Sequence, residues 1–131
     1  MPKREKDECC APKPKLVERR LMTERDALGM EAVFKVLANG TRLRLLHALV
    51  KSGELCVGDL AASVEMRQQA VSNQLQRMSD RGIVEARREG LQMFYRIVDP
   101  CVVELVDRGW CLTEDAAGRV AKRPGDEGKV A

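Results

Sequence analysis

Residues 57–80 decide the fold, and they read VGDLAASV, then EMR, then QQAVSNQLQRMSD. In the first and third pieces the apolar residues recur at helical spacing. They are Leu60, Ala61 and Val64 in the first piece, and Ala70, Val71, Leu75 and Met78 in the third. The break at residues 65–67 separates the two patterns, and Gly82 follows the second. The sequence therefore predicts helices over 57–64 and 68–80 joined by a tight turn, which is a helix-turn-helix.

The flanking segments complete a larger unit. Upstream, a helix over 23–38 begins at a cap formed by Thr23 with Asp26 and stops at Asn39 and Gly40, and a second helix runs over 41–50. Downstream, β-favouring residues on both sides of 87–90 predict a hairpin, and Pro100 can open a last helix that ends near residue 112. This order predicts a mainly α winged helix-turn-helix of about five helices with a small β-hairpin wing.

Length and composition predict one domain with two extensions. The chain has 131 residues, 44% hydrophobic but only 3% aromatic, so aliphatic side chains must fill the core. We expect a flexible N-terminal arm over 1–15, a winged helix-turn-helix over 16–112 that binds DNA and dimerises, and a flexible tail over 113–131. No apolar run is long enough for a membrane span, and the five cysteines suit a reduced, cytoplasmic protein.

Charge points to double-stranded DNA as a partner. The formal net charge is only +3, but residues 66–97 carry six arginines against three acidic residues. Amide, hydroxyl and guanidinium groups on the predicted 68–80 helix can read base edges in a major groove, and a basic wing can contact phosphates. The alternative is an ordinary solvated surface. The candidate DNA-binding residues are Arg67, Gln68, Gln69, Ser72, Asn73, Arg77, Arg87 and Arg88.

Four motifs together resemble the ArsR/SmtB family of metal-responsive repressors over about residues 24–112. They are NGTRLRLL at 39–46, ELCVGDLA at 54–61, AVSNQL at 70–75 and REGLQMFY at 88–95. The resemblance implies a homodimer held together by the first and last helices, bound to palindromic operator DNA and released by a metal or metalloid ion. Many members have Asp and Pro at positions 39 and 40 and His at position 73. Gly58 replaces the second cysteine that thiol-sensing members often carry.

Three cysteines form the main candidate ion site. Cys9 and Cys10 are adjacent on the arm, and Cys56 directly precedes the 57–64 helix. Three thiolates suit pyramidal As(III), which we favour, or Sb(III), and they also accept the soft ions Hg(II), Cd(II) and Pb(II). The resemblance implies that arm cysteines of one protomer join the helix cysteine of the other. Alternatively, Cys56 is a small buried apolar residue and the arm pair has no role.

Cys101 and Cys111 are a second, accessory candidate. Ten residues apart on one helix, they would lie about 15 Å apart along the axis and about 80° apart around it, so one ion cannot bridge them there. They are interpreted first as packing cysteines. His47 is the only histidine and is interpreted as a partly buried packing residue. The zinc sites of the family need several histidines.

Other functions fit parts of the pattern. A repressor that senses thiol oxidation would use the same cysteines without an ion. A small thiol enzyme or metallochaperone would use the vicinal pair as nucleophile or carrier. A single helical histidine and the lack of a phosphate-binding glycine loop argue against an enzyme. A winged helix that contacts only proteins is the remaining alternative.

Overall fold

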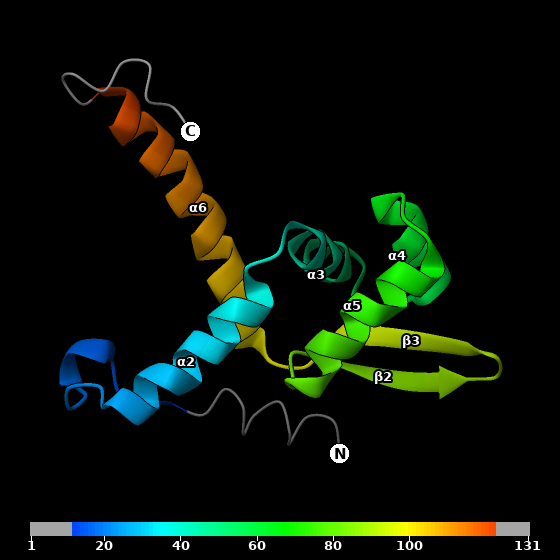
Figure 1. The fold of residues 1–131 in the computed structure, drawn as a ribbon, viewed down its shortest axis with the longest axis horizontal. Helices are drawn as coiled ribbons and strands as arrows, with labels where there is room; N and C mark the ends of the chain where they lie inside the picture. Colours follow the sequence, from blue (N-terminus) through cyan, green and yellow to red (C-terminus); the bar gives the residue numbers. More distant parts are fainter. Residues whose placement is uncertain (1–11, 123–131) are drawn as a thin grey trace.

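A computed structural model describes residues 12–122. Cys9 and Cys10 therefore lie outside the described residues. The elements are η1 (Leu16–Glu18), α2 (Glu24–Leu37), α3 (Gly40–Ser52), β1 (Leu55–Cys56), α4 (Val57–Val64), α5 (Gln68–Asp80), β2 (Val84–Glu89), β3 (Gln92–Ile97) and α6 (Pro100–Lys122). This is a winged helix-turn-helix, as the sequence predicts. The bounds of α4 and α5 agree with the prediction, and Figure 1 shows the β2–β3 wing on the opposite side of the molecule from α2.

The core joins α3, α4, α5 and the sheet. Its fully buried side chains are Leu45, Leu46, Leu49, Leu60, Val71, Leu75, Met78 and Val84. They are aliphatic or methionine, as the low aromatic content predicts, and Tyr95 adds an aromatic ring at the edge of this cluster. Among the described residues no polar or charged side chain is buried. The hydrophobic effect therefore fixes which face of each short helix points inward.

The sheet contains a strand that sequence patterning did not predict. Its order is β1-β3-β2, all antiparallel, with Leu55 opposite Tyr95 and Cys56 opposite Phe94. Two residues are too few to show an alternating pattern, so β1 can be found only from its pairing with β3. The pairing joins the segment before α4 to the wing.

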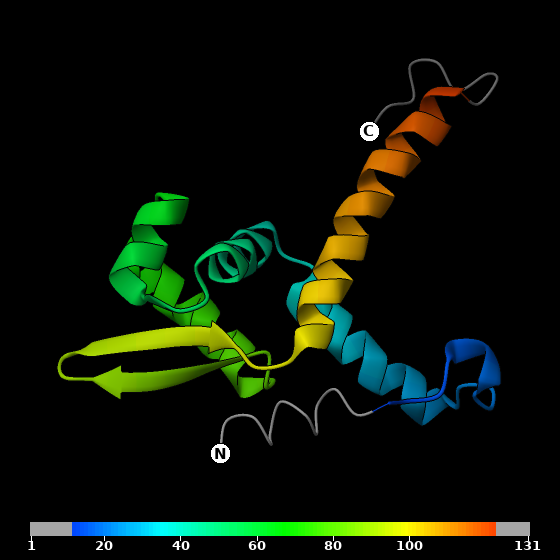
Figure 2. The same ribbon diagram turned by 180° about the vertical axis from the view of Figure 1, so that it is seen from behind.

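The last helix is longer than predicted. The sequence suggested an end near residue 112, but α6 continues to Lys122 and leads away from the rest of the molecule (Figures 1 and 2). Residues 113–122 are thus helical rather than a flexible tail. Glu114, Ala116 and Ala117 favour a helix, and one interior glycine, Gly118, lowers helix stability by only about 1 kcal/mol. Within residues 12–122, no helix has the length and apolar character that crossing a bilayer requires.

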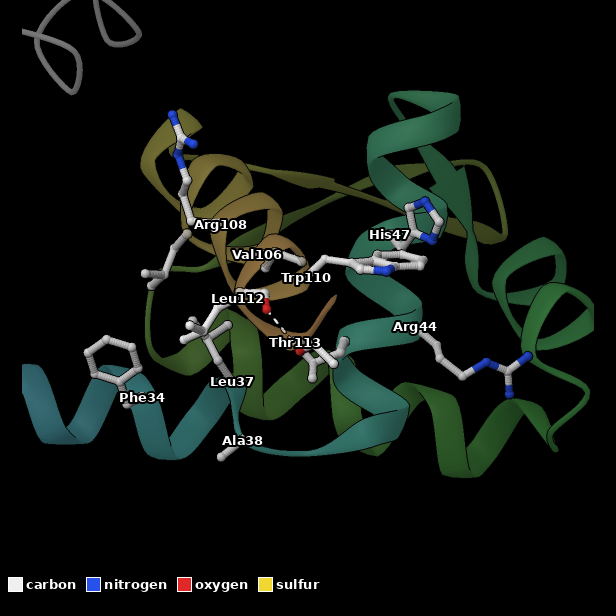
Figure 3. A pocket seen from close by; sticks show the side chains of 13 residues that line it. Phe34, Leu37, Ala38, Arg44, His47, Val106, Arg108, Trp110, Leu112 and Thr113 are labelled. Atoms are coloured by element: carbon white, nitrogen blue, oxygen red, sulfur yellow. Dashed lines mark hydrogen bonds between the residues drawn. The ribbon is translucent and has the colours of Figure 1, made fainter. Parts of the chain in front are cut away.

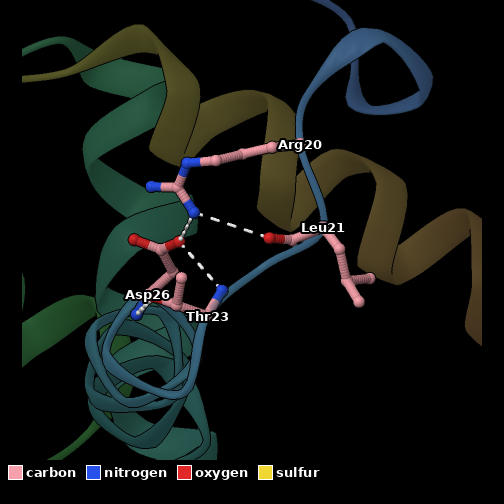
Figure 4. A network of polar contacts seen from close by, with 4 residues as sticks. All are labelled: Arg20, Leu21, Thr23 and Asp26. Carbon is pink, nitrogen blue, oxygen red and sulfur yellow. Dashed lines mark hydrogen bonds and ion pairs between the residues drawn. The ribbon is translucent and has the colours of Figure 1, made fainter.

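The predicted cap at the start of α2 is present (Figure 4). The Asp26 backbone N–H donates to Thr23 Oγ1 at 3.1 Å, and the Thr23 N–H donates to Asp26 Oδ2 at 3.0 Å. Arg20 Nη1 donates to the same carboxylate oxygen at 2.7 Å. The Thr23 N–H, Arg20 and the Thr23 hydroxyl together lower the pKa of Asp26 from 3.8 to about 2. The cap therefore depends on an ionised Asp26.

We expect Asp26→Asn to destabilise the protein at neutral pH but not in acid. A carboxyl group with a lowered folded-state pKa contributes stability above its unfolded-state pKa and loses it as the pH falls. The difference in free energy of unfolding should be constant above about pH 5 and shrink between about pH 4 and pH 2. Denaturant unfolding followed by circular dichroism at each pH measures it. Glu24→Gln, in the same first turn, is the control, and a difference as large at pH 2 as at pH 7 would contradict this role.

Candidate functional site

The outward face of α5 carries the predicted base-reading residues. Val71, Leu75 and Met78 anchor the opposite face in the core. Gln68, Gln69, Asn73 and Arg77 are exposed along the helix, Ser72 is half-buried, and Arg67 is the exposed N-cap residue. Gln69 Nε2 donates to Asn73 Oδ1 at 3.1 Å, so these two amides are aligned along the helix. The structure thus gathers the five predicted α5 residues and the N-cap Arg67 along one polar side of the helix, with no acidic side chain before Asp80.

The turn before α5 sets how this face is presented. Glu65 has a left-handed backbone with φ 54° and ψ 50°, and it is the only non-glycine residue with positive φ in the described part of the chain. Its N–H donates to the Ala62 carbonyl at 3.3 Å, and the Met66 N–H donates to the Ala61 carbonyl at 3.0 Å.

Gly58 of α4 has room for a side chain, because a Cβ there would lie 3.5 Å from Gln68 Nε2, an ordinary contact. Packing therefore does not require the glycine that replaces a family cysteine.

The two predicted wing arginines have different surroundings. Arg87 donates from Nη2 and Nε to the two Glu54 carboxylate oxygens, at 2.7 and 3.1 Å, and from Nη1 to Glu89 at 2.6 Å. These hydrogen bonds raise the pKa of Arg87 and lower that of Glu54. Arg88 is exposed and forms no ion pair within residues 12–122. Arg88 can therefore contact a phosphate without breaking an existing pair, whereas Arg87 cannot.

The three described cysteines are reduced and lie in two places. Cys56 is the N-cap residue of α4 and only 8% exposed, whereas Cys101 and Cys111 are exposed on α6. A hydrogen bond to Asp99 and its negative charge raise the pKa of Cys101, and Cys111 Sγ lies 3.7 Å from Asp115 Oδ2. Residues 12–122 contain no cluster of three His, Cys, Asp or Glu side chains arranged for a metal ion. A site with three such ligands would therefore have to include a side chain from outside these residues or from a second copy of the chain.

An apolar groove lies between α2, α3 and α6, and sequence patterning did not reveal it (Figure 3). Its volume is about 880 Å³, and Phe34, Leu37, Leu105, Trp110 and Leu112 line it. The His47 ring meets the Trp110 ring edge to face, with centroids 5.3 Å apart. His47 is exposed at this groove, so the predicted partial burial was wrong, although its ring does pack against Trp110. A Trp and a Leu on the predicted last helix were the available signal, but their partners come from distant segments.

A winged helix-turn-helix whose recognition helix presents several amides and an arginine, beside a wing that carries further arginines, defines a DNA-binding transcriptional regulator. The family described as "Bacterial regulatory protein, arsR family" matches residues 39–86. The chain also shares 38% identity with a transcriptional repressor SmtB homolog from Synechocystis sp., over 68% of this chain and 67% of that protein. The chain belongs to the ArsR/SmtB family, as its motifs predict.

Two solved structures extend this relationship. The AntR antimony-specific transcriptional repressor shares 57% identity with a TM-score of 0.71, over 83% of this chain and 98% of that one. A homodimeric winged helix-turn-helix DNA-binding domain from Mycobacterium bovis shares 32% identity with a TM-score of 0.65, over 77% of this chain and 95% of that one. Both similarities extend beyond the residues that the family profile covers.

We expect Arg88→Gln to weaken DNA binding mainly through the loss of one phosphate contact. The slope of log K against log salt should become shallower by about 1, with little change in sequence preference. Fluorescence anisotropy of promoter DNA across a salt series measures this. Arg119→Gln, near the far end of α6, is the control of equal charge change. An unchanged slope for Arg88→Gln would exclude Arg88 as a phosphate contact.

Proposed function

We propose that the protein is a homodimeric transcriptional repressor that binds operator DNA and releases it when cysteine thiolates bind a thiophilic metalloid or metal ion. The observation that carries this proposal is the 57% identity with an antimony-specific repressor over nearly all of that chain. Operator DNA as a partner and thiols that act in the reduced form both favour a cytoplasmic location.

DNA binding is assigned to α5 and the wing. The exposed face of α5 offers bidentate amides for adenine and a guanidinium for guanine, from Gln68, Gln69, Asn73 and Arg77. Arg67 and Ser72 flank this face, and Arg88 extends the positive surface to the wing. In a symmetric dimer, two such helices can enter successive major grooves, which matches a palindromic operator.

Dimerisation is assigned to α2 and α6. Trp110 is 56% and Leu112 is 60% exposed, and Leu28 and Phe34 on α2 are also exposed apolar residues. Phe34, Trp110 and Leu112 line the apolar groove (Figure 3), and α2 lies on the opposite side of the molecule from the wing (Figure 1). Apolar surface of this extent usually marks an interface. A second copy placed there would leave both α5 helices exposed to DNA.

The ion site is assigned to Cys56 with Cys9 and Cys10 of the arm. Three thiolates match the pyramidal coordination of As(III) and Sb(III), and the relationship to an antimony-specific repressor favours this group over Hg(II), Cd(II) and Pb(II). Because Cys56 is buried at the start of α4, movement of that segment would open its sulfur to an ion. Such movement is what a repressor needs in order to convert ion binding into DNA release.

Cys101 and Cys111 form a second candidate site, and their exposure favours it. Exposed sulfur can bind a soft ion without any opening of the fold. Both cysteines lie on the proposed dimerisation helix, so a second protomer could bring another thiolate to either position. The two sites differ in one respect that can be measured, because only the first contains Cys56.

We expect Sb(III) or As(III) to release promoter DNA from the reduced protein, with a loss of affinity of about 5- to 150-fold. Cys56→Ser and the double variant Cys9→Ser/Cys10→Ser should abolish release while DNA affinity without the ion is retained. Cys101→Ser/Cys111→Ser is the matched control and should respond like the wild type. Anisotropy measures release, and thiolate charge-transfer absorbance measures ion binding.

The opposite pattern, with loss of response only in Cys101→Ser/Cys111→Ser, would move the sensor site to α6. DNA release by peroxide without any response to ions would identify a redox-sensing repressor instead. Turnover of arsenate or an organomercurial by the purified protein would support a thiol enzyme. Failure to bind promoter DNA even at low salt would contradict the repressor function itself.

We also expect Leu112→Glu to produce a folded monomer with weak operator binding. A charge at the centre of an apolar interface opposes association, but it leaves the core intact because Leu112 lies outside it. Sedimentation velocity measures the mass and circular dichroism checks the fold. Leu91→Glu, at a position that is 99% exposed at the wing tip, is the control for the mass measurement only and should stay dimeric. A dimeric Leu112→Glu variant would contradict the assigned interface.

A further inference from the structure

A row of three residues crosses the whole sheet at the proposed sensor cysteine. Cys56 of β1 lies opposite Phe94 of β3, and Phe94 lies opposite Arg87 of β2. Directly paired residues on neighbouring strands project from the same face of a sheet. The Arg87 guanidinium carbon lies 4.9 Å from the centre of the Phe94 ring. The Phe94 residue therefore lies between Cys56 and Arg87 of the wing in this row.

A second connection runs beside this row. Glu54, two residues before Cys56, binds Arg87 with both carboxylate oxygens, although the two residues are 33 positions apart in sequence. This two-pronged geometry fixes the direction of the guanidinium as well as its distance. Glu89, near the wing tip, accepts a hydrogen bond from Nη1, the third nitrogen of the same guanidinium. The segment that carries Cys56 is thus fastened to the wing by strand pairing, by the Phe94 ring and by the Glu54–Arg87 ion pair.

We propose that Glu54 and Arg87 are positioning residues that hold the wing in its DNA-binding orientation and transmit movement of the Cys56 segment to the wing. Arg87 faces two carboxylates instead of a phosphate, so its contribution to DNA binding comes through the position of the wing. The transmission to the wing rests on the proposed function, because it requires an ion at Cys56. The positioning of the wing does not.

The length of β1 explains how such a connection can switch. Its two residues form the only part of the sheet that joins the Cys56 segment to the wing hairpin. Withdrawal of the Cys56 sulfur toward an ion shifts β1 and carries Glu54 away from Arg87. The wing then keeps its own β2–β3 pairing but loses its fixed orientation relative to α4 and α5.

DNA affinity of Glu54→Gln tests the positioning directly, because two mechanisms predict opposite signs. Removing a negative charge near DNA should raise affinity by simple electrostatics, and it should raise it further if Arg87 is thereby freed to bind a phosphate. Loss of wing positioning should instead lower affinity, which we expect by about threefold, within the range that a partly exposed ion pair can contribute. Glu85→Gln is the control of equal charge change, since Glu85 pairs with Arg96 between β2 and β3, within the wing itself.

Arg87→Lys and Arg87→Gln complete this test. Lysine keeps the charge but cannot form the two-pronged pair, so we expect Arg87→Lys to lose as much affinity as Arg87→Gln. The slope of log K against log salt should stay unchanged in both variants. Thermal unfolding checks that each variant is folded. A slope that becomes shallower by about 1 in Arg87→Gln, together with tighter binding by Glu54→Gln, would overturn the proposal and make Arg87 a phosphate contact.

The transmission is tested by the ratio of DNA affinities without and with Sb(III). We expect this ratio to be at least threefold smaller in Glu54→Gln than in the wild type, with charge-transfer absorbance showing that the ion still binds. Equal ratios would overturn the transmission. If the wild type itself keeps its DNA in Sb(III), the ion-sensing function fails, and the positioning role is then decided by the affinity and salt-slope results alone.

Discussion

The burial of one face of α5 against α3 and α4 is the constraint on which the rest of the structure depends. Val71, Leu75 and Met78 are fully buried, so rotating the helix about its axis would expose three large apolar side chains. Each costs roughly 1.5 to 3 kcal/mol when transferred to water. The polar face is therefore held outward by forces that do not involve DNA. A recognition helix fixed in this way meets DNA with little loss of conformational entropy on binding.

Local sequence signals predicted the helix-turn-helix because each of its elements carries its own pattern. Helical spacing gave α4 and α5 with correct bounds, and Thr23 with Asp26 located the start of α2. The last helix was predicted too short because glycine and proline near the C-terminus suggested a loop, whereas Glu114, Ala116 and Ala117 favour a helix. β1 was missed because two residues have no periodicity, and its existence depends on pairing with a strand 40 residues later along the chain (Leu55 with Tyr95).

Within the candidate site, local patterns likewise predicted some residues, whereas others depend on tertiary contacts. The α5 face was predictable, since side-chain type and helical position together decide which groups point outward. The partners of Arg87 were not, because Glu54 reaches it through tertiary folding that no short-range pattern records. His47 was misjudged for the same reason, since its neighbour Trp110 comes from α6. The family resemblance supplied the thiol hypothesis, and the structure added that Cys56 is buried while the α6 cysteines are exposed.

The burial of Cys56 also affects how fast its thiol can bind an ion. A cysteine with so little solvent exposure reacts faster when the start of α4 opens than when it is closed. For a sensor at this position, the rate of loading would follow the frequency of that opening rather than diffusion of the ion. The same shielding would slow oxidation by small oxidants, so the thiol would stay competent between exposures. An ion already bound by the arm cysteines would be present whenever the helix opens. The rate of loading, as well as the affinity, would then discriminate between ions.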